Sequence, residues 1–155
     1  MKKTLIMIIM ICLISLGCGK NVSETKNNDE IKVINDNVFI QMTDDMFFNS
    51  EDYESQIFQI EGLMLTEPES TAAEGVNPDK LHYFIVRKTP GCCGNDGLAG
   101  LEISYNGTIP EDETWVVGKG IWKPNGYSSY NGWILELYSL EALETRGNEF
   151  LEYNY

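Results

Sequence analysis

Apolar and polar residues alternate with a period of two along most of the chain beyond residue 30. The clearest example is Leu101-Glu102-Ile103-Ser104-Tyr105, which is followed by the turn signal Asn106-Gly107. This pattern predicts a half-buried strand, because successive side chains of a strand point to opposite faces of a sheet. Other segments rich in β-branched or aromatic residues are also predicted strands: Ile31 to Met42, Gln56 to Leu65, His82 to Lys88, Thr114 to Trp122 and Trp133 to Tyr138.

Turn-forming residues separate these predicted strands. The breakers are Glu67-Pro68, Asn77-Pro78, Thr89-Pro90-Gly91, Ile109-Pro110 and Lys123-Pro124-Asn125-Gly126. Gly62, Gly118 and Gly120 fall inside predicted strands, where glycine is typical of a bulge, a sharp bend or a close backbone approach. Short strands with glycine corners predict an all-β fold, a small five-stranded barrel with an extra N-terminal strand.

Helix signals are few. Thr43-Asp44-Asp45 precedes two large apolar residues and predicts a short helix with Thr43 as its cap. The run from Ser139 to Glu144 predicts a second short helix, which ends near Gly147. We therefore expect one or two short helices beside the barrel.

Residues 1–17 have the organisation of a secretory signal. Lys2 and Lys3 precede an apolar stretch from Leu5 to Leu16, which ends at Gly17-Cys18. As a helix this stretch rises only about 18 Å, too little for a hydrocarbon core of roughly 30 Å. Gly17-Cys18 resembles the cleavage site of bacterial lipoproteins, where the cysteine is lipidated at its thiol and becomes the new N-terminus. The alternative is an ordinary signal peptide that leaves Cys18 as an odd thiol.

The remaining chain divides into two parts by composition. Residues 18–30 are polar and almost free of large apolar side chains, which is typical of a solvated tether. Residues 31–155 are long enough for one domain with a single core. We expect this domain to lie on the extracytoplasmic face of the cell membrane, anchored by the lipid on Cys18.

The charge balance excludes one class of partner. The chain has a formal net charge of -13, and removal of Lys2 and Lys3 with the signal leaves nine basic residues against 24 acidic ones, a balance of -15. Such a surface repels phosphate backbones and anionic lipid head groups. We therefore expect no nucleic-acid partner and no polybasic attachment to the membrane.

Two adjacent cysteines are the most distinctive feature of the domain, in the run Thr89-Pro90-Gly91-Cys92-Cys93-Gly94-Asn95-Asp96. Cys12 lies in the signal and Cys18 is the expected lipidation site, so Cys92 and Cys93 are the only free thiols expected after export. Thiolates bind zinc and other soft divalent metals, and the carboxylate of Asp96 adds a third ligand. The flanking glycines allow the backbone to bend so that neighbouring side chains converge.

The sequence leaves other interpretations of this pair open. A disulfide between neighbours is strained, because consecutive Cα atoms are about 3.8 Å apart instead of the usual 4.4 Å or more, so it is a redox switch more readily than a staple. In a purely structural interpretation, one cysteine faces the core and Asp96 accepts backbone N–H bonds in a tight turn. His82, the only histidine, is a candidate fourth ligand, as is water. A lone histidine on a strand is more often a partly buried residue with a satisfied hydrogen bond.

The order of features resembles the C-terminal domain of bacterial YcgQ-type proteins, accessory subunits encoded beside a predicted permease. The Cys-Cys-x-x-Asp signature of that family matches Cys92-Cys93-Gly94-Asn95-Asp96. The other matching pieces are Ile34-Asn35-Asp36-Asn37-Val38-Phe39, Asn49 to Tyr53, Glu61-Gly62, Phe84-Ile85-Val86-Arg87, Trp115-Val116-Val117-Gly118-Lys119-Gly120 and Tyr153 to Tyr155. The resemblance implies an OB-like barrel and a membrane protein, such as a permease, as partner. This chain differs from the longer family members in using a lipid in place of N-terminal membrane spans.

These observations predict a lipid-anchored domain that is not an enzyme. Its Cys92, Cys93 and Asp96 are expected to bind zinc or another soft divalent metal, or to assist a membrane partner that handles one. The alternative is a structural or partner-binding module in which the same loop only shapes the end of the barrel.

Overall fold

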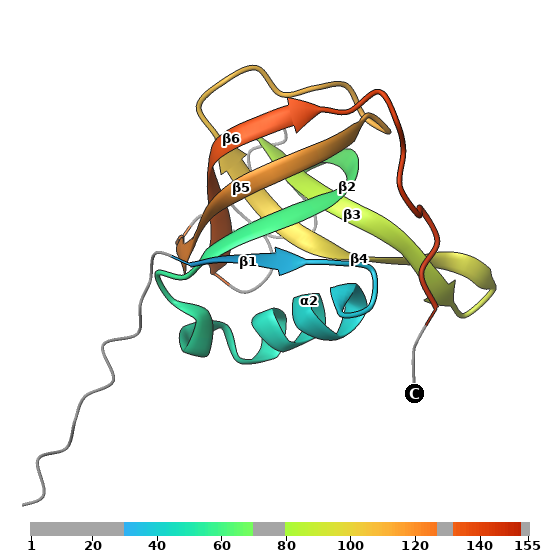
Figure 1. Ribbon diagram of the computed structural model, residues 1–155, viewed down its shortest axis with the longest axis horizontal. Helices are drawn as coiled ribbons and strands as arrows, with labels where there is room; N and C mark the ends of the chain where they lie inside the picture. The colour runs from blue at the N-terminus through green and yellow to red at the C-terminus, as the bar shows by residue number, and fades with distance from the viewer. Residues whose placement is uncertain (1–29, 70–79, 127–131, 153–155) are drawn as a thin grey trace, which may run out of the picture.

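The computed structural model describes residues 30–69, 80–126 and 132–152, which form one sheet and one α-helix (Figure 1). The strands are β1 (Ile31–Ile34), β2 (Ile57–Pro68), β3 (Leu81–Gly91), β4 (Gly94–Tyr105), β5 (Trp115–Pro124) and β6 (Trp133–Ala142). The helix α2 (Phe39–Phe48) and the 3-10 turn η1 (Ser50–Tyr53) lie between β1 and β2. The mostly-β fold predicted from the alternating pattern is confirmed.

The strands pair in the order β1-β2-β3-β4-β6-β5, and β2 also pairs with β5. The pairings therefore lead from β2 through β3, β4, β6 and β5 back to β2. Only two of the pairings are parallel, namely β4 with β6 and β1 with β2. In the second of these, Ile31 lies opposite Ile57, so β1 is the extra N-terminal strand that the sequence predicts.

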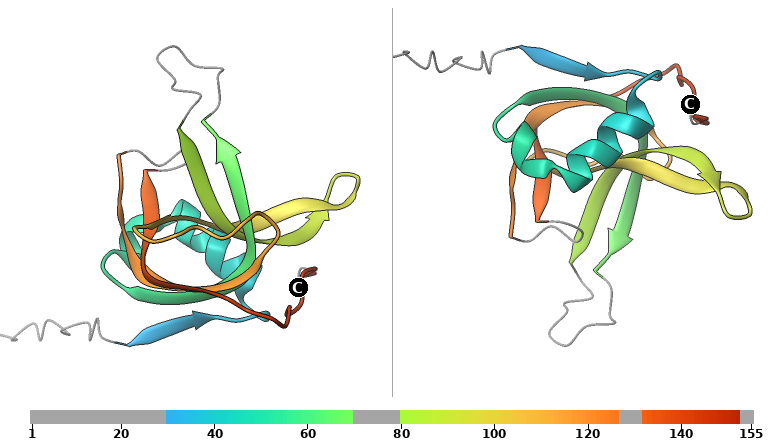
Figure 2. Two further views of the ribbon diagram at one scale, coloured as in Figure 1. Left: turned by 90° about the horizontal axis from the view of Figure 1, so that it is seen from above. Right: turned by 90° about the horizontal axis from the view of Figure 1, so that it is seen from below.

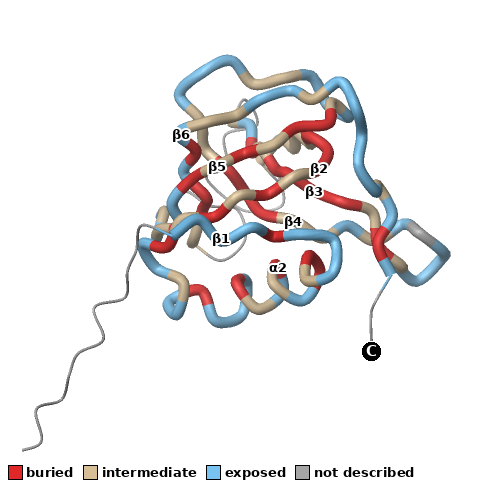
Figure 3. The backbone as a smooth tube through the Cα atoms, viewed as in Figure 1, coloured by how far each residue is buried: buried red, intermediate tan, exposed pale blue. Residues whose placement is uncertain are grey.

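The apolar faces of the strands enclose the main core. Its fully buried members include Phe58, Ile60, Ile85, Ile103, Val116 and Leu135. The helix α2 lies across one end of the strands (Figure 2) and adds Phe39, Ile40 and Met46 to the same core. The buried positions are concentrated where the strands and α2 face one another (Figure 3). Burial of these side chains is the main source of stability, at about 25 cal/mol per Å² of apolar surface.

The predicted strand from Ile31 to Met42 is wrong beyond Ile34. The side-chain oxygen of Asn35 accepts a hydrogen bond from the backbone N–H of Asn37 at 3.0 Å, a local turn that ends the strand. The helix α2 follows, because Phe39, Ile40, Thr43 and Met46 recur with helical spacing and are all buried. The sequence prediction took Phe39 to Met42 as strand and placed a helix only from Thr43 on.

The predicted helix cap at Thr43 is also wrong. Thr43 lies inside α2, and its hydroxyl donates to the backbone oxygen of Phe39 at 2.9 Å, one turn earlier. This back-bonding is a common alternative for threonine within helices. The helix therefore begins one turn earlier than predicted, at Phe39, after Val38, which makes no side-chain cap.

The second predicted helix does not form, since Ser139 to Ala142 belong to strand β6. Leu140 lies opposite Gly118 of β5 and packs against the main core. Pairing with β5 and this packing outweigh the local helix preference of Leu, Glu and Ala. Residues 143–147 then continue outside the named helices and strands.

The glycine corners predicted from the sequence are present. At Gly120 the β5–β6 register shifts, and a Cβ there would overlap the backbone oxygen of Glu136. The predicted break at Thr89-Pro90-Gly91, in contrast, does not end its strand, because β3 continues to Gly91. The β3–β4 register is irregular between Thr89 and Gly91, and Pro90, which lacks an N–H group, lies there.

Candidate metal centre

The strands β3 and β4 form a hairpin whose turn is made by Cys92 and Cys93. Gly91 pairs with Gly94, so the two cysteines are the only residues between the strands. Gly94 has a φ of 119°, a backbone conformation that side chains disfavour and glycine adopts at no steric cost. The hairpin extends away from the rest of the sheet in both views of Figure 2. We call residues 91–96 the hairpin tip.

The sulfur atoms of Cys92 and Cys93 lie close to one another, and that of Cys92 also lies near the carboxylate of Asp96. The two Sγ atoms are 3.5 Å apart, and Cys92 Sγ lies 3.9 Å from Asp96 Oδ2. Both thiols are free, all three residues are exposed, and one ligand atom from each lies within 4.8 Å of the others. Figure 3 shows the exposure of this end of the hairpin. The convergence expected from the flanking glycines is therefore present.

Gly91 provides the space in which the Asp96 carboxylate folds over the turn. A Cβ at position 91 would overlap Asp96 Oδ1 and would also crowd the backbone nitrogen of Gly97. A Cβ at Gly94 would meet nothing within 4 Å. The two glycines thus act differently: Gly94 shapes the backbone, and Gly91 makes room for the acid.

Two of the three separations between the ligand atoms are close to those that a metal ion requires, and all three atoms lie within 4.8 Å of one another. With Zn–S bonds of about 2.3 Å and tetrahedral angles, two thiolates on one zinc ion lie roughly 3.8 Å apart. A thiolate and a carboxylate oxygen on the same ion lie roughly 3.5 Å apart. The observed separations of 3.5 and 3.9 Å each differ from these values by a few tenths of an ångström, which side-chain rotation supplies.

The same contacts also fit the structural interpretation of the tip. Asp96 Oδ1 accepts a hydrogen bond from the backbone N–H of Cys93 at 3.3 Å, as expected for an acid that braces a tight turn. Neither cysteine faces the core, however, since both are exposed. That part of the structural interpretation is wrong, and the other oxygen of Asp96 remains directed at Cys92.

His82 is not a fourth ligand of this group. It lies near the opposite end of β3, about 30 Å from the turn at the usual rise of a strand, and is not among the clustered ligands. Its ring is buried, and Nδ1 is 2.6 Å from Glu102 Oε1, so the satisfied contact expected of a lone strand histidine is confirmed at that nitrogen. The other ring nitrogen has no hydrogen-bond partner in the described part of the chain and is 4.0 Å from Glu69.

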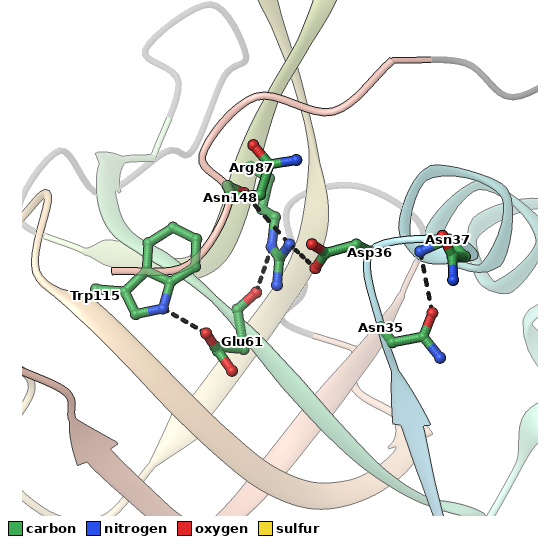
Figure 4. Close-up of polar contacts among 7 residues, drawn as sticks. All are labelled: Asn35, Asp36, Asn37, Glu61, Arg87, Trp115 and Asn148. Atoms are coloured by element: carbon green, nitrogen blue, oxygen red, sulfur yellow. Dashed lines mark hydrogen bonds and ion pairs between the residues drawn. The ribbon is translucent and has the colours of Figure 1, made fainter. Parts of the chain in front are cut away.

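Sequence reasoning missed a buried cluster at the base of the hairpin, around Arg87 (Figure 4). Arg87 is 2% exposed, and its guanidinium donates to the backbone oxygen of Glu61 at 2.8 Å and to the carboxylate of Asp36. Phe39 and Trp115 lie 4.8 and 5.2 Å from it in cation–π geometry. Trp115 in turn donates to the Glu61 carboxylate at 2.6 Å. The available signal was a charged residue directly after the apolar run Phe84-Ile85-Val86.

Two cavities among the described residues lie elsewhere, and both are lined in part by α2. The larger one, about 760 Å³, is lined by Asp36, Asp44, Asp45, Tyr53 and Glu152 among others, and the smaller one, about 320 Å³, by Phe84, Trp122 and Trp133 among others. Burial and the hydrogen bond to Asp45 raise the pKa of Tyr53 to about 12, and the same bond lowers the pKa of Asp45. Neither cavity includes a residue of the hairpin tip.

The expected lipidation site, Cys18, lies outside the residues that the structure describes, as do the signal, the tether apart from Glu30, and residues Tyr153 to Tyr155. Within the described ranges, none of the helices has the length and apolar character that crossing a bilayer requires.

No protein-family model matches the chain, and no curated protein matches it. The chemistry of the hairpin tip therefore has to be argued from its own geometry.

Proposed function

We propose that this chain is a lipid-anchored, extracytoplasmic domain whose hairpin tip binds a soft divalent metal such as zinc. The observation that carries the proposal is the convergence of Cys92, Cys93 and Asp96 at an exposed turn. Two thiolates and one carboxylate form a donor set suited to zinc, and the open fourth position is typical of sites that exchange a ligand. In the wider form of the proposal, the site assists a membrane partner that handles the metal.

The residue types at the tip support a role in binding, because the turn does not need them for its structure. An exposed turn does not need sulfur for packing, and glycine and asparagine are the usual residues of tight hairpin turns. Two exposed thiols in an oxidising compartment are exposed to oxidation without a structural benefit. A role in binding accounts for their position.

The OB-like barrel also belongs to this proposal. The return of the pairings from β5 to β2, with β4 and β6 parallel and the other pairs of the ring antiparallel, supports a five-stranded barrel. A YcgQ-type domain is consistent with this topology and with the Cys-Cys-x-x-Asp run. By that resemblance, a permease or another membrane protein is the proposed partner.

The lipid anchor is proposed from the residues around Cys18 alone. In a bacterial host that processes lipoproteins, the full chain is expected to incorporate labelled fatty acid and to sediment with membranes. The variant Cys18→Ala is expected to lose both properties. Equal incorporation of label by this variant would contradict the anchor.

Metal titration tests the metal proposal directly. The full chain carrying Cys12→Ser and Cys18→Ser retains only the thiols of the tip and should take up zinc stoichiometrically under reducing conditions. Uptake should be lost when Cys92 or Cys93 is also replaced by serine. Asp96→Asn should weaken uptake, and Asp112→Asn is the matched control, since it removes the same charge from an exposed loop outside the tip.

The alternative function is a structural or partner-binding module in which the loop only shapes the end of the barrel. It is supported by the hydrogen bond between Asp96 and the Cys93 N–H. It predicts that zinc, cobalt and cadmium all bind no better to the parent chain than to the serine variants. Equal background binding by all variants would therefore favour this alternative over the metal site.

A further inference from the structure

The metal ligands of one hairpin tip form an incomplete set. Cys92, Cys93 and Asp96 are the ligand group found among the described residues, and no fourth protein ligand lies with them there. Closed zinc sites almost always have four protein ligands in a tetrahedron. All three residues are exposed, so the site is open to solvent.

The incomplete set can be completed by another protein, and a second copy of the same chain offers the best-matched donors. Two copies together supply four thiolates, the Cys₄ set that zinc favours in closed sites. We propose that two copies of this chain bind one soft divalent ion between their hairpin tips, through Cys92 and Cys93 of each copy, an inference that rests on the proposed metal site.

The geometry of each tip suits this arrangement. The sulfur separation of 3.5 Å is close to the roughly 3.8 Å that a tetrahedral ion requires, so each tip binds as a two-sulfur clamp with little rearrangement. Two identical clamps around one ion are related by a two-fold axis through that ion. Both sulfurs of one clamp come from a single turn, so a second turn can approach from the open side.

The shape of the hairpin removes the usual steric obstacle to such a dimer. Among the described residues, Lys88 is the outermost position of β3 at which the C-terminal segment pairs, through hydrogen bonds with Glu149 and Leu151 at 2.9 Å. Beyond it, the end of the hairpin extends away from the body (Figure 2). Two bodies can therefore remain apart while their tips meet, and no large apolar interface is needed.

Charge has two opposing effects on the dimer. Each chain has a net charge of -13, so two bodies repel one another, and dissolved salt weakens this repulsion. The divalent cation offsets two of the four negative charges that the thiolates bring to the point of contact. Asp96 is not needed as a ligand in this bridged form and instead remains on the N–H of Cys93, where it braces the turn.

The proposal predicts an unusual dependence on metal concentration. With half an equivalent of metal per chain, dimers should predominate, because each ion then has two tips available. With excess metal, each tip should bind its own ion, with Asp96 and water as the further ligands, and the dimer should dissociate. A simple one-to-one site gives no such maximum.

Native mass spectrometry is the test, because it counts chains and ions in one measurement. The full chain with Cys12→Ser and Cys18→Ser, kept reduced in a mild detergent, is titrated with zinc from none to several equivalents. We expect a species of two chains and one ion that is maximal at half an equivalent. With cobalt in place of zinc, the thiolate-to-metal absorption per ion should be about twice as strong at half an equivalent as in excess, since four thiolates are replaced by two.

The variants separate this inference from the proposed function. Cys92→Ser and Cys93→Ser should abolish the bridged species, whereas Asp96→Asn and its control Asp112→Asn should retain it. One ion per chain with monomers at every ratio would overturn the bridge and leave the metal site standing. No uptake at all would overturn both, and dimers that persist without metal or in the serine variants would overturn the bridge by showing that the contact lies elsewhere.

Discussion

The tip and the base of the β3–β4 hairpin hold polar groups under opposite conditions. At the tip, Cys92, Cys93 and Asp96 are exposed and make polar contacts with one another. At the base, the Arg87 guanidinium is 2% exposed and contacts Asp36, Glu61, Phe39 and Trp115. Polar groups at the base stabilise the fold, because any change there leaves a buried group unpaired. Polar groups at the tip can change at little cost to folding, so they are available for binding.

The largest effect that tests this comparison is expected at Arg87. Arg87→Ala removes a buried charge and leaves the backbone oxygen of Glu61 without its donor, so we expect a loss of about 3 kcal/mol or more in unfolding free energy. Arg87→Lys should lose less but still be destabilised, because lysine lacks the planar fork. Arg146→Ala is the control, since Arg146 is exposed and its ion pair with Glu149 should contribute under about 1 kcal/mol. Urea unfolding measures all three, and equal losses at positions 87 and 146 would contradict the comparison.

A smaller loss is expected for the buried pair of His82 and Glu102. Glu102→Gln keeps the shape but removes a charged partner from a 2.6 Å contact, and should cost about 2 kcal/mol. Glu136→Gln is the matched control, because Glu136 pairs with Lys123 at the surface. The control should change stability by less than about 0.5 kcal/mol. If Glu102→Gln left the unfolding free energy unchanged, this end of β3 would tolerate change as the tip does.

Alanine at the two tip glycines should separate backbone shape from metal affinity. Gly91→Ala forces the Asp96 carboxylate to move and should weaken zinc binding about tenfold, as loss of a supporting contact does at other metal sites. Gly94→Ala meets no atom, but it places a side chain at a φ of 119° and should cost about 1 kcal/mol of stability. Zinc titration and urea unfolding of both variants provide the measurement. If Gly91→Ala bound zinc like the parent, Asp96 would have no role in the site.

The smallest effect is expected at Tyr53, whose partly buried side chain is intermediate between the exposed tip and the buried base of the hairpin. Its folded pKa of about 12 is above its ordinary value of 10.0, so its contribution to stability is present below pH 10 and is lost as pH rises toward 12. The same hydrogen bond is the largest cause that lowers the pKa of Asp45. Asp45 therefore contributes to stability above its ordinary pKa of 3.8, and this contribution is lost as pH falls. Urea midpoints across pH should show both slopes reduced in Tyr53→Phe. Identical pH profiles for parent and variant would contradict this assignment.

The sequence predicted those parts of the fold in which local pattern and tertiary contacts agree. Strands from Gln56, His82, Thr114 and Trp133 have alternating or aromatic-rich sequences, and their sheet partners reinforce that preference. The prediction failed at Phe39 to Met42, where a short, mostly apolar segment is compatible with either strand or helix and the Asn35 turn decides between them. It failed again at Ser139 to Ala142, where pairing with β5 outweighs helix propensity.

The hairpin tip was partly predictable for a different reason. Neighbouring residues remain neighbours in any fold, so the proximity of Cys92, Cys93 and Asp96 follows from their spacing together with the two glycines. Whether His82 could reach the tip as a ligand depended on where β3 ends. Because β3 continues through Pro90, nearly its whole length separates His82 from the two cysteines. The Arg87 cluster joins residues from Asp36 to Asn148, which no local pattern indicates.

The contact between Lys88 and residues 149–151 has a consequence for how the molecule is made. Leu151 is buried, and its backbone and that of Glu149 cover the edge of β3 beside Lys88. These residues follow all six strands in the chain, so that edge stays exposed during folding until the C-terminal segment has docked on β3. Until then the uncovered edge is open to pairing with other chains, and a fusion or truncation that removes this segment recreates the same vulnerable state in the finished protein.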